Sequence, residues 1–168
     1  MPNKEKRDIL IFPKFDNIEL IENIRKKYDP LYSLIMPHIT LVFPFSDNIS
    51  NQELNSKLSK LLENFKPFEV IFKGTSISKD KYIFLNQIKG NDEIIKLHDL
   101  IYSNILPTHL NSKIEYIPHI TLGRLNNNSN EFLEEFPYKF KTKIDKICIE
   151  QIGKNEESII IKEIELKE

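Results

Sequence analysis

The stretches PHITLVFPF, residues 37–45, and PHITLGRL, residues 118–125, share the pentapeptide Pro-His-Ile-Thr-Leu. Their histidines lie 81 positions apart (119 − 38), close to half of the 168-residue chain. Each copy opens an apolar run of the length and composition typical of a β-strand. A strand motif duplicated at this spacing predicts a fold of two related halves, each of which contributes one copy.

The polar residues of each copy fall on one face of the predicted strand, because successive side chains of a strand point to opposite faces. His38 therefore shares a face with Thr40, and the Ile and Leu of the motif point into a core. The same holds for His119 and Thr121 in the second copy. If the halves pack about a pseudo-twofold axis, two imidazoles and two hydroxyls meet at one site.

Two histidines and two threonines suit acid–base chemistry on a phosphodiester. Histidine titrates near neutrality, so one imidazole can remove a proton while the other protonates the leaving oxygen. Threonine hydroxyls can donate hydrogen bonds to the charged phosphate oxygens. Threonine is also a common strand former, and one histidine of this kind would favour a structural reading. The duplication favours the catalytic reading for His38, His119, Thr40 and Thr121, with no cofactor required.

The two motifs, His38-Ile39-Thr40 and His119-Ile120-Thr121, resemble those of the 2H phosphoesterases. The longer strings PHITLVFPF and IPHITLGRL are similar to the bacterial 2′-5′ RNA ligase branch of that superfamily. The resemblance covers most of the chain. It implies an α+β fold with two pseudo-twofold lobes, in which antiparallel-rich sheets line a central cleft and helices lie outside. It also implies one domain over residues 1–168.

The activity that the resemblance implies is metal-independent phosphoesterase chemistry on RNA ends or small nucleotides. The reaction is expected to open a 2′,3′-cyclic phosphate or to cleave a 2′-5′ linkage by two-histidine acid–base catalysis. Two alternatives stay open. One is an RNA 2′-5′ ligase or tRNA-end processing enzyme, which runs the same step backwards. The other is a non-catalytic sensor that binds nucleotides without turning them over.

Three further residues are candidates for substrate binding. Arg124 resembles the arginine that often follows the second motif in this branch, and a guanidinium can clamp phosphate oxygens in bidentate fashion. Strict alternation places Arg124 opposite His119, so only a bulge or strand end at Gly123 would bring it into the site. Phe43 occupies the matching position of the first copy. Phe43 and Tyr116 are candidate base-stacking rings, while strand aromatics are more often core residues.

Charge and composition limit the partners. The net charge is −1, and a protein that grips long duplex nucleic acid usually has a basic balance or patch. We therefore expect a small nucleotide or RNA end as substrate, and a monomer. Cys148 is the only cysteine, and no spacing of His and Cys typical of a zinc site occurs. With no long apolar stretch and no signal peptide pattern, we expect a cytoplasmic protein without membrane contact.

The hydrophobic periodicity predicts about seven strands and three or four helices. The predicted strands cover residues 8–12, 38–45, 68–76, 81–89, 117–125, 141–151 and 158–166, and the predicted helices cover residues 17–28, 50–65 and 92–106. The polar segment 126–130 is expected to be a loop, and residues 131–136 are expected to form one or two helical turns.

Overall fold

A computed structural model describes residues 5–126, 131–132 and 134–168. Within these residues the chain forms eight strands, three α-helices and one short 3-10 helix. In chain order they are β1 (Arg7–Ile11), α1 (Ile18–Tyr28), β2 (Ile39–Phe45), α2 (Asn51–Leu61), β3 (Phe68–Ile77), β4 (Tyr82–Lys89), α3 (Asn91–Asn104), η1 (Pro107–His109), β5 (His119–Arg124), β6 (Lys139–Ile144), β7 (Lys146–Ile152) and β8 (Ser158–Glu165).

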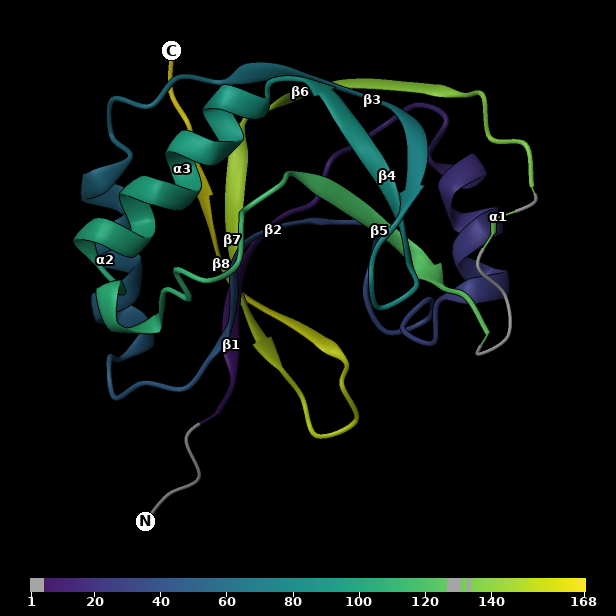
Figure 1. Cartoon of the computed structure of the whole chain (residues 1–168). Coiled ribbons are helices and arrows are strands. Elements are labelled where there is room, and N and C mark those ends of the chain that lie inside the picture. The colour runs from purple at the N-terminus through teal and green to yellow at the C-terminus, as the bar shows by residue number, and fades with distance from the viewer. Residues whose placement is uncertain (1–4, 127–130, 133) are drawn as a thin grey trace.

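The strands form two four-stranded antiparallel sheets. The first has the order β2-β1-β7-β8 and the second has the order β5-β4-β3-β6. The two motif strands, β2 and β5, are edge strands that lie side by side in the middle of the molecule (Figure 1). Helices α2 and α3 pack outside the first sheet, and α1 packs outside the second (Figure 1). The predicted α+β fold with two lobes and outer helices is confirmed.

One face of each motif strand is buried in the hydrophobic core, as the alternation of the motif predicts. Ile39 and Leu41 are fully buried, as are Ile120 and Leu122. The histidine and threonine of each motif, on the other face, are only partly buried. Complete burial of one such aliphatic side chain contributes about 1.5–3 kcal/mol to the free energy of folding. The hydrophobic core therefore fixes the orientation of each motif strand. The Ile and Leu side chains point into the core, and the His and Thr side chains point to the opposite face.

One predicted strand is in fact two strands that belong to different sheets. The pattern over residues 141–151 predicts a single strand, but β6 pairs with β3 in the second sheet and β7 pairs with β1 in the first. Asp145 separates them. Phe140 and Ile144 are buried in one lobe, and Ile147 and Ile149 follow in the next strand. The buried aliphatic positions shift from an even number, Ile144, to odd numbers, Ile147 and Ile149, across Asp145, and the prediction of one strand overlooked this break in the alternation.

The predicted helical turns at 131–136 are wrong for the residues that the structure describes there, none of which is helical. Phe132 packs edge-on against Tyr28 of α1, with ring centroids 5.6 Å apart. Phe136 stacks on Phe140 of β6 at 5.6 Å. These ring contacts attach Phe132 to α1 and Phe136 to β6. Most of the predicted loop, residues 127–130, lies outside the described residues.

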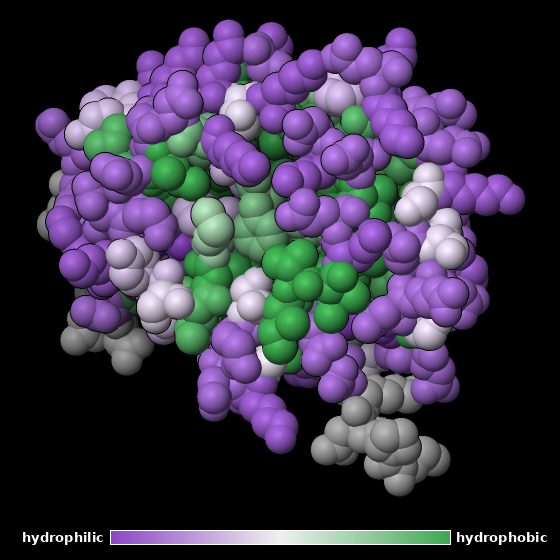
Figure 2. Space-filling view, turned by 180° about the vertical axis from the view of Figure 1, so that it is seen from behind, coloured by the Kyte–Doolittle hydropathy of each residue, from purple (hydrophilic) through white to green (hydrophobic). Residues whose placement is uncertain are grey.

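Two further features concern possible membrane spans and the apolar part of the surface. Within the described residues no helix has both the length and the apolar character needed to span a bilayer. Seen from behind, apolar side chains gather in the lower half of that face (Figure 2). A pocket of about 710 Å³ lies between the loop before β2 and the strands β7 and β8, and its lining includes Met36, Cys148 and Ile160.

Candidate functional site

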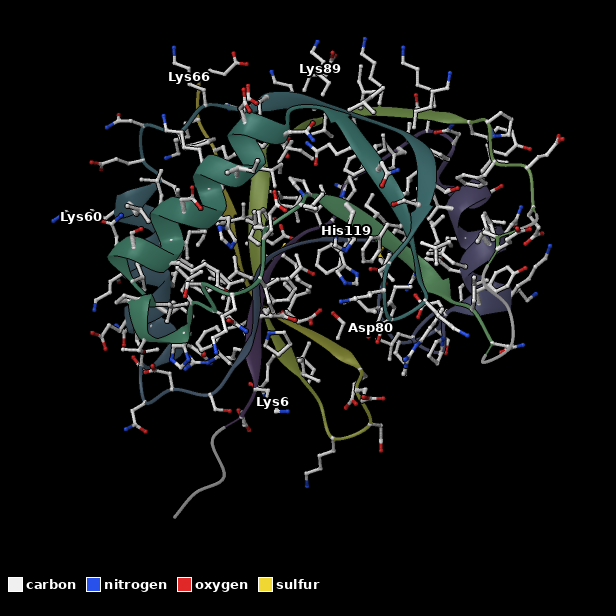
Figure 3. All side chains as sticks on the ribbon, in the orientation of Figure 1. Lys6, Lys60, Lys66, Asp80, Lys89 and His119 are labelled. Atoms are coloured by element: carbon white, nitrogen blue, oxygen red, sulfur yellow. The ribbon has the colours of Figure 1, made fainter. Side chains whose placement is uncertain are left out.

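The two motif histidines have matching environments. His38 donates its Nδ1–H to the carbonyl of Met36, 2.8 Å away, and His119 donates its Nδ1–H to the carbonyl of Ile117 at 2.7 Å. A carbonyl oxygen only accepts, so Nδ1 must carry a proton in both rings. In the neutral imidazole, the lone pair is therefore on Nε2. His119 projects toward the middle of the molecule, whereas the lysines labelled with it lie at the periphery (Figure 3).

Burial sets the protonation state of both imidazoles. It lowers the pKa of His38 and of His119 from their ordinary value, because a partly desolvated ring disfavours the positive charge. The hydrogen bonds to the Met36 and Ile117 carbonyls act in the opposite direction and are weaker. A charge on His119 also lowers the pKa of His38, so the two rings lie close enough to interact. In the free protein the neutral forms are favoured.

Each motif strand has a bulge directly after its threonine. In β2, Thr40 lies opposite Leu10 of β1, and the next paired residue, Val42, lies opposite Ile9. Leu41 is therefore an extra residue in the ladder. A bulge of this kind bends the strand and increases its twist. It is present at the equivalent position of both motifs, which extends the similarity of the two halves beyond the pentapeptide.

The bulge in β5 decides the position of Arg124. Thr121 lies opposite Phe84, and Arg124 lies opposite Tyr82, with Leu122 as the extra residue between them. Phe84 and Tyr82 share a face of β4 because they are two residues apart. Arg124 is thus on the same face as the second motif, where unbroken alternation would have placed it on the other side.

Gly123 makes this backbone path possible. Its φ is +145°, a conformation that residues with a side chain rarely adopt. A Cβ at this position would lie 2.5 Å from the backbone carbon of Tyr28 at the end of α1. The close approach of α1 to β5 and the irregular backbone therefore both depend on glycine.

Although Arg124 lies on the same face of β5 as the second motif, it is well separated from His119. Their partners on β4, Tyr82 and Asn86, are four residues apart. Since a strand advances about 3.3 Å per residue, Arg124 lies on the order of 13 Å along the sheet from His119. Its Nε donates to the carbonyl of Asp80 at 3.0 Å. Its guanidinium carbon lies over the ring of Tyr82, 5.0 Å from the centroid. These contacts hold the guanidinium at the outer end of the site.

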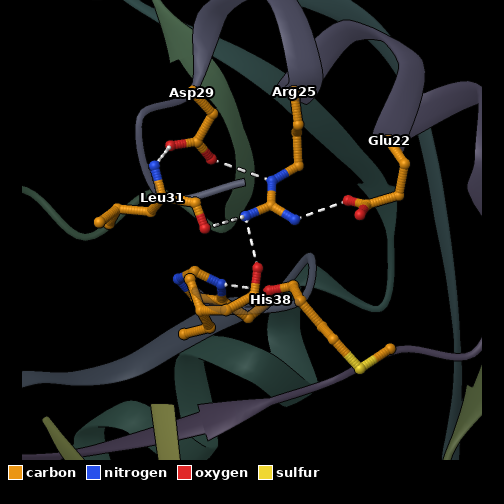
Figure 4. Close-up of polar contacts among 7 residues, drawn as sticks. Glu22, Arg25, Asp29, Leu31 and His38 are labelled. Carbon is orange, nitrogen blue, oxygen red and sulfur yellow. Dashed lines mark hydrogen bonds and ion pairs between the residues drawn. The ribbon is translucent and has the colours of Figure 1, made fainter. Parts of the chain in front are cut away.

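A buried arginine that the sequence reasoning missed supports the first motif (Figure 4). Arg25 of α1 is fully buried and donates to the carboxylates of Glu22 at 2.6 Å and Asp29 at 2.9 Å. It also donates to the carbonyl of Ile35 at 2.7 Å. The loop held in this way ends at Met36, the hydrogen-bond partner of His38. The signal in the sequence was an arginine on the apolar face of the predicted helix.

Tyr116 connects the two motifs. Its hydroxyl donates to the carbonyl of Thr40 at 2.6 Å, across the boundary between the sheets. One face of its ring is covered by His98, with centroids 3.8 Å apart. These contacts favour a role in holding β2 next to β5 over the predicted stacking on a base. Phe43 remains a candidate for base stacking, because 47% of its surface is exposed.

Among the described residues no group of three or more His, Cys, Asp and Glu side chains could hold a metal ion. The site between the sheets offers two imidazoles whose Nδ1 atoms are bound to backbone carbonyls, the motif threonines beside them and a guanidinium further along β5. This set can transfer protons at a bound phosphate and hold its charge.

Comparison with protein families and curated proteins gives consistent results. Residues 13–156 match the family described as the 2′-5′ RNA ligase superfamily. A Bacillus licheniformis protein is 31% identical over 125 residues, covering 71% of this chain and 70% of that protein. A Geobacillus thermodenitrificans protein is 30% identical over 121 residues, covering 71% of this chain and 69% of that protein. Both relatives carry provisional names as phosphoesterases.

Solved structures share the fold at low sequence identity. LigT of Escherichia coli in its apo form matches with a TM-score of 0.74 and 15% identity, covering 99% of both chains. The same protein complexed with 3′-AMP matches with a TM-score of 0.69 and 17% identity, covering 99% of this chain and 100% of that one. A protein of Thermus thermophilus gives a TM-score of 0.73 at 12% identity, covering 96% of this chain and 98% of that one.

Proposed function

This chain belongs to the 2′-5′ RNA ligase superfamily, and on that premise we propose that it is a metal-independent phosphoesterase that acts on RNA ends or small nucleotides. The observation that carries the proposal is the identical presentation of His38 and His119, each with its Nδ1–H bound to the carbonyl two residues earlier. The 3′-AMP complex of LigT supports a nucleotide ligand for this fold. We further propose one domain that acts as a cytoplasmic monomer.

The proposed reaction opens a 2′,3′-cyclic phosphate or cleaves a 2′-5′ linkage. The Nε2 of one neutral histidine takes a proton from water as the water oxygen bonds to phosphorus. The bond from phosphorus to the departing ribose oxygen breaks, and the protonated Nε2 of the other histidine gives its proton to that oxygen. The two fixed Nδ1–H groups keep both Nε2 atoms available for this transfer.

The other site residues bind the substrate in this proposal. The hydroxyls of Thr40 and Thr121 donate to the phosphate oxygens that carry charge in the transition state. Arg124, at the far end of β5, contacts a part of the nucleotide away from the reacting phosphorus. Phe43 is available to a base from the side of β2, and Tyr116 holds the two motif strands together.

The decisive experiment is a substrate screen with excess chelator. Purified protein is incubated with 2′,3′-cyclic mononucleotides and with 2′-5′-linked dinucleotides in EDTA, and the products are assigned by phosphorus NMR. We expect turnover of at least one class, at a rate that EDTA leaves unchanged. Activity lost in EDTA and restored by zinc or magnesium would overturn the proposed chemistry. Tight nucleotide binding without any product would favour the sensor.

The pH dependence of this activity follows from the lowered pKa values of the histidines. The reaction needs one ring neutral and the other protonated, which gives a bell-shaped profile of kcat/KM for the coupled pair. Because burial lowers the pKa of both free-enzyme histidines, the protonated ring becomes scarce as the pH rises toward neutrality. We expect the maximum of kcat/KM below about pH 6.5, the ordinary histidine value. A maximum in the alkaline range would contradict the assignment.

A further inference from the structure

Helix α1 is attached to both motifs near its C-terminal end. On one side, a Cβ on Gly123 of β5 would lie 2.5 Å from the backbone carbon of Tyr28, so helix and strand are in close contact there. On the other side, the Arg25 guanidinium donates to the carbonyl of Ile35, 2.7 Å away, in the loop before β2. Arg25 and Tyr28 are three residues apart and are therefore neighbours on the helix. The end of α1 thus joins the strand of the second motif to the loop that leads into the first.

The Arg25 guanidinium has a fixed position before it reaches that loop. Its side chain is fully buried, and it donates from Nη1 to Glu22 at 2.6 Å and from Nε to Asp29 at 2.9 Å. Asp29 also accepts from the N–H of Leu31 at 2.9 Å, so one carboxylate links the guanidinium to the start of the loop (Figure 4). Charge-assisted hydrogen bonds away from water are strong and directional. The Nη2 that binds Ile35 is held by them.

The bond to Ile35 restricts the carbonyl that binds His38. The C=O of Ile35 and the N–H of Met36 belong to one planar peptide, so Arg25 fixes the orientation of that plane. Met36 precedes Pro37, which restricts its backbone to extended conformations. Few rotations therefore separate the Arg25 hydrogen bond from the Met36 carbonyl, which accepts the Nδ1–H of His38 at 2.8 Å.

The second motif is held by a different kind of group. Tyr116 stands three residues before its histidine, as Ile35 does in the first copy. It is held through its side chain, whose hydroxyl donates to the carbonyl of Thr40 at 2.6 Å. The two motif histidines thus make the same hydrogen bond to a carbonyl, but the segments that carry these carbonyls are supported by different contacts.

We propose that Arg25 is a positioning residue that keeps the Nδ1–H of His38 on the Met36 carbonyl and places His38 relative to the second motif. Because α1 also packs against β5, a change at Arg25 alters the position of one histidine relative to the other. Its effect on turnover rests on the proposed function, since proton transfer needs the Nε2 atoms of both rings at the phosphate.

Arg25→Lys is the test variant. Lysine keeps the positive charge but lacks the planar fork that binds two carboxylates and a carbonyl at once. We expect kcat on a 2′,3′-cyclic nucleotide to fall about 10- to 100-fold, the effect of a displaced catalytic group. KM should change little, because the threonines that bind the phosphate in our proposal are unaltered.

A second variant and a control accompany it. Glu22→Ala removes one anchor of the guanidinium at a side chain that is 30% exposed, and it tests the same contact with a smaller expected fall in kcat if Arg25→Lys does not fold. The matched control is Arg7→Lys. Arg7 is also buried, but it holds the loop after β2 through the carbonyls of Asp47 and Ile49. Arg7→Lys should lower the thermal stability and leave kcat unchanged.

The tautomer of His38 is a readout that a loss of stability alone would not move. Long-range ¹H–¹⁵N NMR spectra distinguish the two neutral forms of each ring, and the His38→Ala and His119→Ala variants assign the signals. In wild type both rings should carry the proton on Nδ1 when they are neutral. Arg25→Lys should give a mixture of tautomers for His38 and leave His119 unchanged, whereas Arg7→Lys should change neither.

The outcomes separate this inference from the proposed function. A wild-type tautomer of His38 in Arg25→Lys would overturn the positioning role, and so would equal losses of kcat in Arg25→Lys and Arg7→Lys. If wild type turns over no substrate, the phosphoesterase proposal fails, but a mixture of His38 tautomers in Arg25→Lys would still support the positioning role of Arg25.

Discussion

The replacement of His38 or of His119 by alanine is expected to lower kcat on a 2′,3′-cyclic nucleotide by about 10²–10⁴-fold, the usual worth of a positioned general acid or base. Each variant retains one imidazole whose Nδ1–H is fixed by a backbone carbonyl, but the proton relay then lacks either its base or its acid. The double variant should be little slower than the single ones, because the two groups act as a unit.

The measurement is kcat and KM for the three variants beside wild type, with circular dichroism and thermal unfolding to show that each remains folded. Full activity in either single variant would remove that histidine from the mechanism. Multiplication of the two single effects in the double variant would show that the histidines act independently.

The second large effect is expected on stability, from Gly123→Ala. The substitution combines an unfavourable φ of +145° with a Cβ that would lie 2.5 Å from the backbone of Tyr28. Strain at such a φ costs about 1–3 kcal/mol, and overpacking against a fixed neighbour costs a similar amount. We expect the free energy of unfolding to fall by about 2–6 kcal/mol, measured by urea denaturation with an unchanged slope.

Gly74→Ala is the matched control. Gly74 has φ +86°, and a Cβ there would meet nothing within 4 Å. It therefore carries the conformational cost alone, about 1–2 kcal/mol. Equal losses for the two variants would show that the contact of β5 with α1 is not tightly packed. A larger loss for Gly123→Ala would identify the close approach to Tyr28 as the constraint that fixes the bulge.

Much of the site follows from local pattern. Alternation along a strand predicts that His38 and Thr40 share a face, because the period of two is a property of the extended backbone itself. The duplication at half the chain length predicts two lobes, and the family resemblance predicts the arrangement of sheets and helices. The structure confirms the two-lobed α+β fold. The chemistry assigned to the four motif residues stays a prediction for the kinetic experiments.

Features that depend on contacts distant in sequence could not be predicted in the same way. The split of the segment 141–151 into β6 and β7 depends on which strand each half pairs with, and the shift of the apolar alternation at Asp145 does not identify those partners. Arg25 lies on the apolar face of its helix, but its role arises from the carbonyl of Ile35 and the loop that it holds. The periodicity of the chain identifies neither the partner strands of β6 and β7 nor the carbonyl that Arg25 binds.

Arg124 shows the division most clearly. The sequence by itself determined that a guanidinium lies three residues after Thr121 and that a glycine stands between them. Whether it faces the histidines was decided by the register of β5 against β4. One extra residue in a strand reverses every side chain beyond it. Local propensity permits the bulge at Gly123, but the packing of α1 against β5 and the pairing of Arg124 with Tyr82 select it.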